Sequence, residues 1–252
     1  MSILASKGES TYLALIGDVR RSREHTDRRG LQRQLERSLE RINTSLAPAL
    51  ASRFILTLGD EFQGLFLDPQ AGLSAILALE AELRSSRLRY ALGWGSLSTP
   101  LREVAIGMDG PCFHRAREAM TIAKQRDRWV TVAGFGEETD RIVNAILGLI
   151  GAVRATWTPI QAETAAMMRD RKVQTEVAAA RGVALPTVHK ALRGALYGSV
   201  TEAEEAVRCI LRAAAHEMPE RSSPHDRSSP AARRSPRAAS MAQRTSPRKR
   251  KP

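Results

Sequence analysis

Short apolar runs alternate with amphipathic segments over residues 11–135. Apolar runs that end at glycine or polar residues predict buried strands, here at residues 12–19, 53–58, 62–67 and 88–97. Between these runs, leucine and isoleucine recur at helical spacing, which predicts amphipathic helices, here at residues 27–47 and 69–84. The order β-α-β-β-α-β predicts a ferredoxin-like split βαβ arrangement.

The pattern changes at Gly136, after which helical spacing continues and strand-like runs stop. Before that point, the pattern predicts a further helix at residues 107–125 and a strand at 129–133. After it, helices are expected at residues 139–153, 156–169, 174–180, 186–196 and 201–216. An α/β part followed by an all-helical part predicts an α+β protein. We expect domains at residues 11–135 and 158–218, joined by a connecting helix at 136–157.

Net charge is concentrated in residues 219–252. The chain has 39 Lys and Arg against 27 Asp and Glu, a net charge of +12, and the last 34 residues hold ten basic and two acidic ones. This segment is also rich in proline and serine and poor in large apolar side chains. Such a composition predicts a disordered tail, and its arginine clusters favour contact with nucleic acid or another polyanion. The alternative is a solubilising tail.

Two cysteines, Cys112 and Cys209, are too few for a disulfide framework, which favours a reducing compartment. A membrane-spanning helix needs about 20 consecutive apolar residues, and the longest candidate, at residues 145–153, is much shorter. The first ten residues carry no apolar signal region. We therefore expect a cytoplasmic protein without a membrane partner.

Residues 174–196 have the pattern of a helix-turn-helix, which needs a small residue where its helices touch and a glycine in the turn. Ala178 fits the first position and Gly182 the second. Arg181 precedes that glycine, and we expect its stem to pack while its charge reaches water. Residue types suited to base edges and phosphates then face outward on the second helix: Thr187, His189, Lys190 and Arg193. The alternative is an ordinary helical hairpin capped by Gly182.

Acidic residues stand at the end of the first strand and in the turn between the second and third strands. Asp18 closes the first apolar run, and Asp60 and Glu61 follow Gly59. Strands one and three are neighbours in a split βαβ arrangement, so their ends can bring Asp18 and Asp60 close together. Paired carboxylates suit Mg²⁺ or Mn²⁺, which can clamp a triphosphate. The alternative is a pair of solvated turn aspartates.

Four sequence blocks resemble the SatD family of bacterial proteins, in the order ALIGDVRRSR, LTLGDEFQGLF, YALGWGSL and GPCFHRAREA. The same blocks are more distantly similar to class III nucleotidyl cyclases and GGDEF diguanylate cyclases. In those enzymes, an aspartate after the first strand and one on the hairpin hold two metal ions. The resemblance therefore implies Asp18 and Asp60 as metal ligands, with Glu61 as a further candidate, and places phosphates near the backbone of Val19 and Arg20.

Other positions depart from the cyclase pattern. Cyclases use an asparagine and, four residues later, an arginine to stabilise the transition state, and here these positions hold His114 and Glu118. Leu56 stands where cyclases hold a purine-reading lysine. Arginines near both blocks are candidates for phosphate binding, namely Arg20, Arg21, Arg23, Arg115 and Arg117.

Three functions follow from these patterns. The first is a SatD-like bacterial regulator, in which the cyclase-like domain senses a nucleotide or metal and the helix-turn-helix binds DNA. The alternative is a metal-dependent nucleotidyl cyclase or nucleotidyltransferase that acts on a nucleoside triphosphate. The third is a structural partner protein with an inert core. We expect a homodimer held mainly by residues 1–135, because the cyclase resemblance implies a site completed across a two-fold interface and helix-turn-helix units commonly read paired half-sites.

Overall fold

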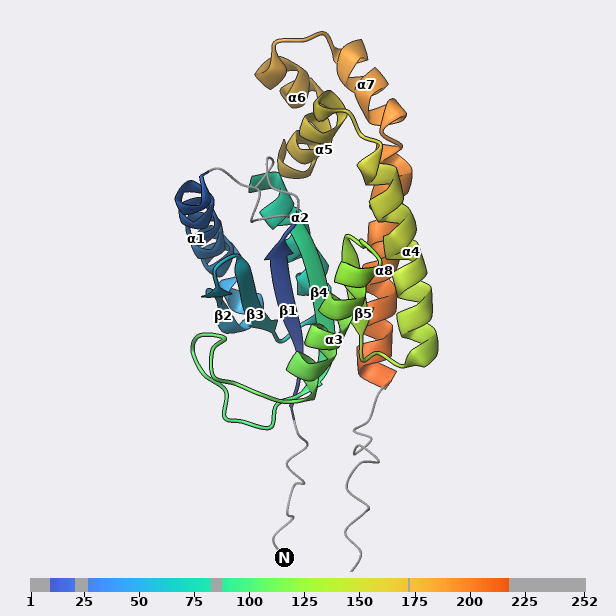
Figure 1. Cartoon of the computed structure of the whole chain (residues 1–252). Helices are drawn as coiled ribbons and strands as arrows, with labels where there is room; N and C mark the ends of the chain where they lie inside the picture. Colours follow the sequence, from blue (N-terminus) through green and yellow to red (C-terminus); the bar gives the residue numbers. More distant parts are fainter. Residues whose placement is uncertain (1–9, 21–26, 83–87, 172, 218–252) are drawn as a thin grey trace, which may run out of the picture. The chain divides into compact units, whose positions relative to one another are not determined.

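The computed structural model describes residues 10–20, 27–82, 88–171 and 173–217 of the 252-residue chain (Figure 1). The chain divides into two units, Met1–Glu220 and Arg221–Pro252. The second unit lies outside the described residues, and so does the whole of the predicted tail at 219–252. None of the described helices combines the length and the apolar character that crossing a bilayer requires.

A five-stranded sheet lies at the centre of the first unit. Its strands are β1 (Thr11–Val19), β2 (Leu50–Leu58), β3 (Glu61–Phe66), β4 (Leu88–Ser96) and β5 (Val130–Ala133). They lie in the order β2-β3-β1-β4-β5. β1 is antiparallel to both of its neighbours, β3 and β4, and β5 joins β4 in parallel. The five predicted strands, and the pairing of the first with the third, are therefore confirmed.

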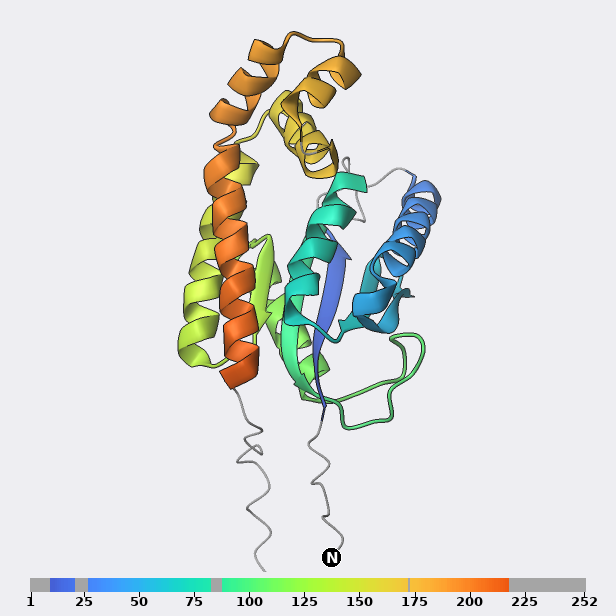
Figure 2. The same cartoon turned by 180° about the vertical axis from the view of Figure 1, so that it is seen from behind.

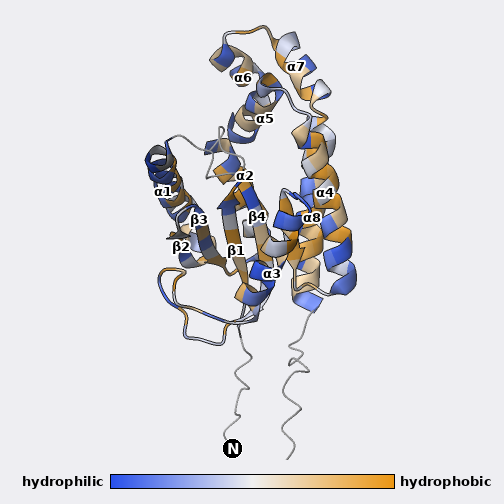
Figure 3. Cartoon of the chain, in the orientation of Figure 1, coloured by the Kyte–Doolittle hydropathy of each residue, from blue (hydrophilic) through white to orange (hydrophobic). Residues whose placement is uncertain are grey.

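Helices cover both faces of this sheet, because alternate strand residues point to opposite sides. Leu13 and Leu15 of β1 belong to one core, and Ala14 and Ile16 belong to the other. The first core includes side chains from α1 (Arg28–Ser45), α2 (Pro69–Glu82), α4 (Glu137–Ala155) and α8 (Tyr197–Glu217). The second core includes α3 (Pro111–Gln125). Figure 3 shows the hydrophilic outer side of α1 beside the more hydrophobic strands.

The helix α3 lies unusually close to β4. A Cβ atom on Gly93 would lie 2.2 Å from the carbonyl oxygen of Cys112 and 2.4 Å from the backbone nitrogen of Ala116. Only glycine leaves room for the helix backbone at that distance. Gly93 therefore fixes the path of α3 across the sheet, and with it the position of the last turn of α3 beside the end of β1.

The helices α4 and α8 run side by side (Figures 1 and 2). Val207 and Leu211 of α8 are fully buried and belong to the same core as the sheet. The segment predicted as a helical domain at 158–218 thus contributes its last helix to the main core. Independent folding of that segment stays a prediction.

Three short helices form a third, smaller core. They are α5 (Pro159–Arg171), α6 (Gln174–Arg181) and α7 (Leu185–Gly194). Val177 and Ala178 of α6 pack with Val188 and Leu192 of α7, and all four are buried. Met167 and Met168 of α5 pack against them. The predicted helices of this region are therefore present, with α6 and α7 meeting as the sequence indicates.

Several element boundaries differ from the predictions. β2 begins at Leu50 rather than at residue 53, and α8 begins at Tyr197 rather than at residue 201. The helix predicted from residue 107 begins at Pro111, because Gly107 and Gly110 have positive φ and belong to the preceding loop, and proline favours a first helical turn. The helix predicted from residue 156 begins at Pro159. There Thr158 acts as its cap: its hydroxyl accepts from the backbone N–H of Gln161, whose side chain in turn accepts from the N–H of Thr158.

Both outer strands of the sheet have polar partners within the chain. At β2, the N–H of Arg53 donates to the carbonyl of Glu103 at 2.8 Å, and its carbonyl accepts from Ala105 at 3.0 Å. At β5, the side-chain amide of Asn144 contacts both backbone groups of Val132, each at 2.8 Å. The loop before α3 and a side chain of α4 therefore occupy hydrogen-bonding positions along the two sheet edges.

Candidate functional site

The predicted acidic residues lie where β1 ends beside the β2–β3 hairpin. Asp18 pairs with Glu61 in the antiparallel ladder between β1 and β3. Directly opposed residues have side chains on the same face, with Cβ atoms about 5 Å apart. Asp60 lies in the turn just before β3. The structure thus brings the strand end and the hairpin together, and Glu61, rather than Asp60, is the residue opposite Asp18.

Two cationic side chains contact this carboxylate pair. Nζ of Lys124, in the last turn of α3, lies 3.0 Å from Oδ1 of Asp18 and 3.9 Å from Oε2 of Glu61. Nη1 of Arg89, on β4, lies 3.5 Å from Oδ2 of Asp18. The side chains of Asp18 and Arg89 are only 13% and 12% exposed. Each carboxylate oxygen of Asp18 therefore has its own cationic partner in a partly shielded environment.

The turn that follows α3 extends this charge cluster. Asp127 adopts a left-handed conformation with φ 49°, and its carboxylate lies 3.1 Å from Arg89 and 3.1 Å from Arg20. Arg20 also donates to the carbonyl oxygens of Asp127 and Arg128, at 3.2 and 2.8 Å. Arg20, a predicted phosphate-binding residue, therefore ties the end of β1 to the turn between α3 and β5.

The pKa of Glu61 depends on its burial and on the charged side chains around it. Partial burial raises the pKa of Glu61 above its usual value, and the negative charges of Asp18 and Asp60 raise it further. The nearby ammonium of Lys124 acts in the opposite direction. Carboxylates crowded in this way need a positive counter-charge, and the chain supplies one from α3.

The cyclase resemblance implies Mg²⁺ or Mn²⁺ on Asp18, Asp60 and Glu61, and the arrangement of side chains does not fit a preformed site of that kind. Among the described residues, no group of three or more His, Cys, Asp or Glu side chains is placed to hold a metal ion. The oxygens of Asp18 and Glu61 instead face Lys124 and Arg89.

The remaining phosphate-binding candidates near α3 also have partners in the chain. Arg115 donates to the carbonyl oxygen of Trp94 at 2.6 Å. Arg117 donates to Oδ1 of Asp109 at 3.3 Å, and Nε2 of His114 lies 2.9 Å from the same oxygen. The hydrogen bond with His114 holds the pKa of Asp109 below its usual value. Arg117 and His114 thus share Asp109, just before α3, while Arg115 contacts the backbone of β4.

The start of α1 carries its own acidic cap. The backbone N–H of Gly30 donates to Oδ1 of Asp27 at 2.8 Å, as is usual for an aspartate that precedes a helix. Arg21 and Arg23, predicted to bind phosphate, lie outside the described residues. At this helix end, the described chain therefore presents a carboxylate close to the free N–H groups.

A different arrangement of side chains occurs on α7. Gly182, between α6 and α7, has φ 64° and ψ 33°, a left-handed conformation that favours glycine. The predicted DNA-contacting residues are all exposed on the helix that follows: Thr187, His189, Lys190 and Arg193. Within the part of the chain that the structure describes, their side chains have neither hydrogen bonds nor ion pairs.

Arg181 corrects one expectation for this region. Its guanidinium does not reach water but turns inward, and its side chain is 13% exposed. Nη1 of Arg181 donates to Oγ1 of Thr164 at 2.6 Å, which fastens α6 to α5. The partner on α5 could not be identified from the pattern of residues 174–196, because it lies ten residues before that segment.

The sequence patterns did not predict a buried ionic cluster between the sheet helices and α5. Glu204 of α8 is 1% exposed and accepts two hydrogen bonds from Arg169 of α5, at 2.6 and 2.8 Å. Arg154 of α4 lies 3.6 Å from Glu204, pairs with Glu80 of α2, and stacks 4.2 Å from the ring centroid of Trp129. A signal was present in α8, where Glu204 falls in the apolar repeat with Val207 and Leu211.

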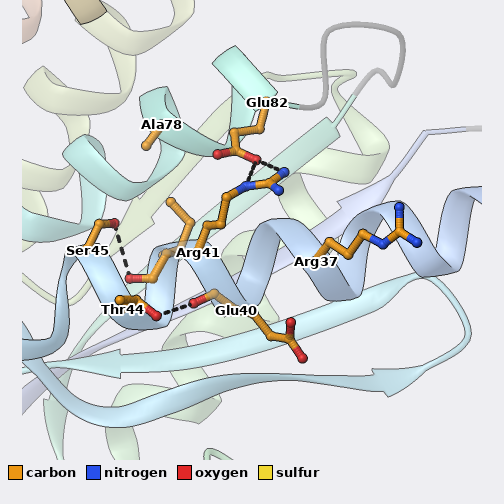
Figure 4. Close-up of a pocket in the computed structure, with 8 residues that line it drawn as sticks. Arg37, Glu40, Arg41, Thr44, Ser45, Ala78 and Glu82 are labelled. Atoms are coloured by element: carbon orange, nitrogen blue, oxygen red, sulfur yellow. Dashed lines mark hydrogen bonds and ion pairs between the residues drawn. The ribbon is translucent and has the colours of Figure 1, made fainter.

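An open groove lies between α1 and α2 (Figure 4). Arg41 of α1 reaches across it to the carboxylate of Glu82 on α2, and Arg37 points away along α1. Glu40, Thr44 and Ser45 also line the groove, and the hydroxyls of Thr44 and Ser45 donate to backbone carbonyls of α1 itself. The groove is therefore bridged by an exposed ion pair.

Comparison with known proteins finds similar solved structures and a matching family. None of the curated proteins matches the chain. A solved structure of a bacterial light-regulated adenylyl cyclase is similar with 14% sequence identity and a TM-score of 0.39, over 59% of this chain and 81% of the other. The SatD family model matches residues 12–186, which include the acidic end of β1, the β2–β3 hairpin and the α6–α7 turn. This protein belongs to the SatD family.

Proposed function

We propose that this SatD-family protein is a DNA-binding regulator and that α6, the Gly182 turn and α7 form its helix-turn-helix. The observation that carries the proposal is the exposed face of α7, where four polar side chains have no partner within the described residues. These are Thr187, His189, Lys190 and Arg193. Side chains that stay unpaired on a well-packed helix are available for base edges and phosphates.

The packing beneath that face supports the same assignment. Val188 and Leu192 of α7 are buried against α6, so the opposite side of α7 must face outward. The inward turn of Arg181 onto Thr164 adds a third helix, α5, as a support. Arginine and lysine on such a helix suit guanine edges and phosphates.

The sheet would then serve as the sensing body of the regulator. The strand order β2-β3-β1-β4, with two antiparallel neighbours on β1, supports the ferredoxin-like, nucleotidyl-cyclase-like arrangement. Cyclase or nucleotidyltransferase chemistry remains the alternative. It predicts pyrophosphate release when the purified protein is incubated with the four nucleoside triphosphates and Mn²⁺, and the regulator proposal predicts none.

The decisive experiment measures sequence preference. A pool of random duplexes is enriched on the full-length protein, and the enriched and scrambled duplexes are then compared by fluorescence anisotropy. Lys190→Ala/Arg193→Ala should reduce the preference for the enriched duplex by about 1–3 kcal/mol for each base that the variant no longer recognises.

A matched control removes two exposed arginines from α1, in Arg33→Ala/Arg37→Ala. This variant should keep the preference of the wild-type protein. Failure to enrich any sequence, or equal preference in the α7 variant and the control, would show that α6 and α7 form an ordinary packing hairpin.

We further propose that the regulator acts as a homodimer, since helix-turn-helix units commonly read two half-sites related by a two-fold axis. Light scattering should give twice the monomer mass at tens of micromolar, roughly the affinity range of a modest specific interface. A monomer at that concentration, with and without nucleotide, would contradict this part of the proposal.

A further inference from the structure

The ammonium of Lys124 occupies a position between the two opposed carboxylates at the end of β1. We propose that Lys124 is the resident cation of the Asp18–Glu61 pair, so that a divalent cation enters this pair only when that ammonium is removed. The proposal concerns the sheet alone and is independent of DNA binding by α7.

The first support is geometric. Nζ of Lys124 lies 3.0 Å from Asp18 and 3.9 Å from Glu61, and these carboxylates come from two neighbouring strands. Because Gly93 lets α3 lie directly on β4, the last turn of α3 reaches the end of β1 without a displacement of the helix. The lysine is thus delivered to the carboxylates by the packing of the sheet.

The second support is charge balance. Three carboxylates and three cationic side chains contact one another in this cluster. They are Asp18, Glu61 and Asp127 on one side, and Arg20, Arg89 and Lys124 on the other. An added divalent ion would face cations already in contact with the carboxylates, and placing like charges together is strongly unfavourable.

The third support is the different freedom of the two main cations. The Arg89 side chain is 12% exposed and also bonds Asp127, whereas the Lys124 side chain is 44% exposed. Lysine is a flexible point charge, and arginine is a planar donor held by several hydrogen bonds. Lys124 is therefore the cation whose loss would free carboxylate oxygens, while Arg89 keeps Asp18 in place.

The test measures Mn²⁺ uptake by the full-length protein from the loss of the electron paramagnetic resonance signal of free Mn²⁺. We expect Lys124→Met to bind one Mn²⁺ at least about tenfold more tightly than the wild-type protein, since a competing positive charge is removed. Adding Asp18→Asn to Lys124→Met should abolish the gain. Lys124→Gln provides a second variant of the same exposed position and should show the same gain.

The matched control is Arg126→Met, which removes an exposed positive charge just after the same helix. It should leave Mn²⁺ uptake at the wild-type level. The proposal is overturned if the wild-type protein binds Mn²⁺ at a site that Asp18→Asn removes. It is equally overturned if neither Lys124 variant exceeds the Arg126→Met control.

Discussion

The end of β1 and the exposed face of α7 are both rich in polar side chains, but they use them in opposite ways. At the end of β1, the charges of Asp18, Arg89 and Lys124 are paired with one another and partly shielded from water. On α7, Lys190 and Arg193 are exposed and have no side-chain partner among the described residues.

The contrast shows why residue type alone is a weak guide to a binding site. Charges that are neutralised by the same chain offer little to a ligand unless an internal partner is displaced, because pairing already satisfies them. For exposed polar groups on a rigid helix, a ligand has no internal partner to displace. The α7 face is therefore the stronger binding candidate, although the cyclase resemblance points first to the β1 end.

The largest effect on stability is expected where α8 and α5 meet. Glu204→Ala should lower the free energy of unfolding by about 3–5 kcal/mol, because it leaves Arg169 without its buried partner and removes one of the two carboxylates that Arg154 contacts. Urea denaturation of the full-length protein measures this change. Glu205→Ala, at an exposed neighbour that pairs with Arg208, should change the free energy of unfolding by less than about 0.5 kcal/mol. Equal effects of Glu204→Ala and Glu205→Ala would show that the buried ionic cluster does not join α8 to α5.

The salt dependence of DNA binding separates α7 from the basic tail. Each neutralised phosphate adds about 0.9 to the slope of log affinity against log salt, so deletion of residues 219–252 should reduce the slope by roughly 3–6. Ten basic residues in that segment supply the charge. Affinity for enriched and scrambled duplexes should fall about equally, as measured by anisotropy at several salt concentrations. An unchanged slope would mean that the tail does not contact DNA.

Two glycine substitutions with opposite expected effects on stability test whether the turn between α6 and α7 requires a left-handed residue. Gly182→Ala should destabilise the protein by about 1–2 kcal/mol, because alanine must adopt the left-handed conformation. Gly148→Ala, within α4 and with open space around the added Cβ, should stabilise it by about 0.5–1 kcal/mol. Thermal unfolding measures both changes. A neutral Gly182→Ala would indicate that the chain can turn there without the left-handed residue.

The smallest effect concerns pH at the end of β1. The pKa of Glu61 is raised in the folded state, so the folded protein retains a proton that the unfolded chain has lost. The free energy of unfolding should therefore decrease as the pH rises from about 4, the usual glutamate range, through the higher folded pKa. In Glu61→Gln, the free energy of unfolding should no longer show this decrease with pH. In Glu118→Gln, which changes an exposed glutamate of α3, the decrease should remain. Parallel pH profiles for wild-type and Glu61→Gln proteins would contradict the shift.

Hydropathy patterns predicted the strands and helices well because each pattern is local. β1 reads as an apolar run, and the α1 leucines recur at helical spacing. The start of α3 was less predictable, since it depends on positive φ at Gly107 and Gly110 in a loop with no regular pattern.

The candidate sites were predictable only in part. The end of β1 could be placed beside the hairpin, because strand adjacency follows from the order of the elements. The sequence paired Asp18 with Asp60, however, and only the register of the ladder shows that Glu61 lies opposite Asp18. Lys124 and Arg89 could not be identified as their partners, since the approach of α3 and the register of β4 are tertiary properties. The outward residues of α7 were predictable because helical spacing also determines the direction of a side chain.

The hydrogen bonds along the two outer strands bear on solubility. An outer strand with free N–H and C=O groups can pair with a strand of another molecule and start aggregation. At β2, the loop that reaches Arg53 takes up both of its backbone groups, and at β5 the amide of Asn144 does the same for Val132. A loop on one edge and a single side chain on the other thus occupy backbone groups that a strand of another molecule would need.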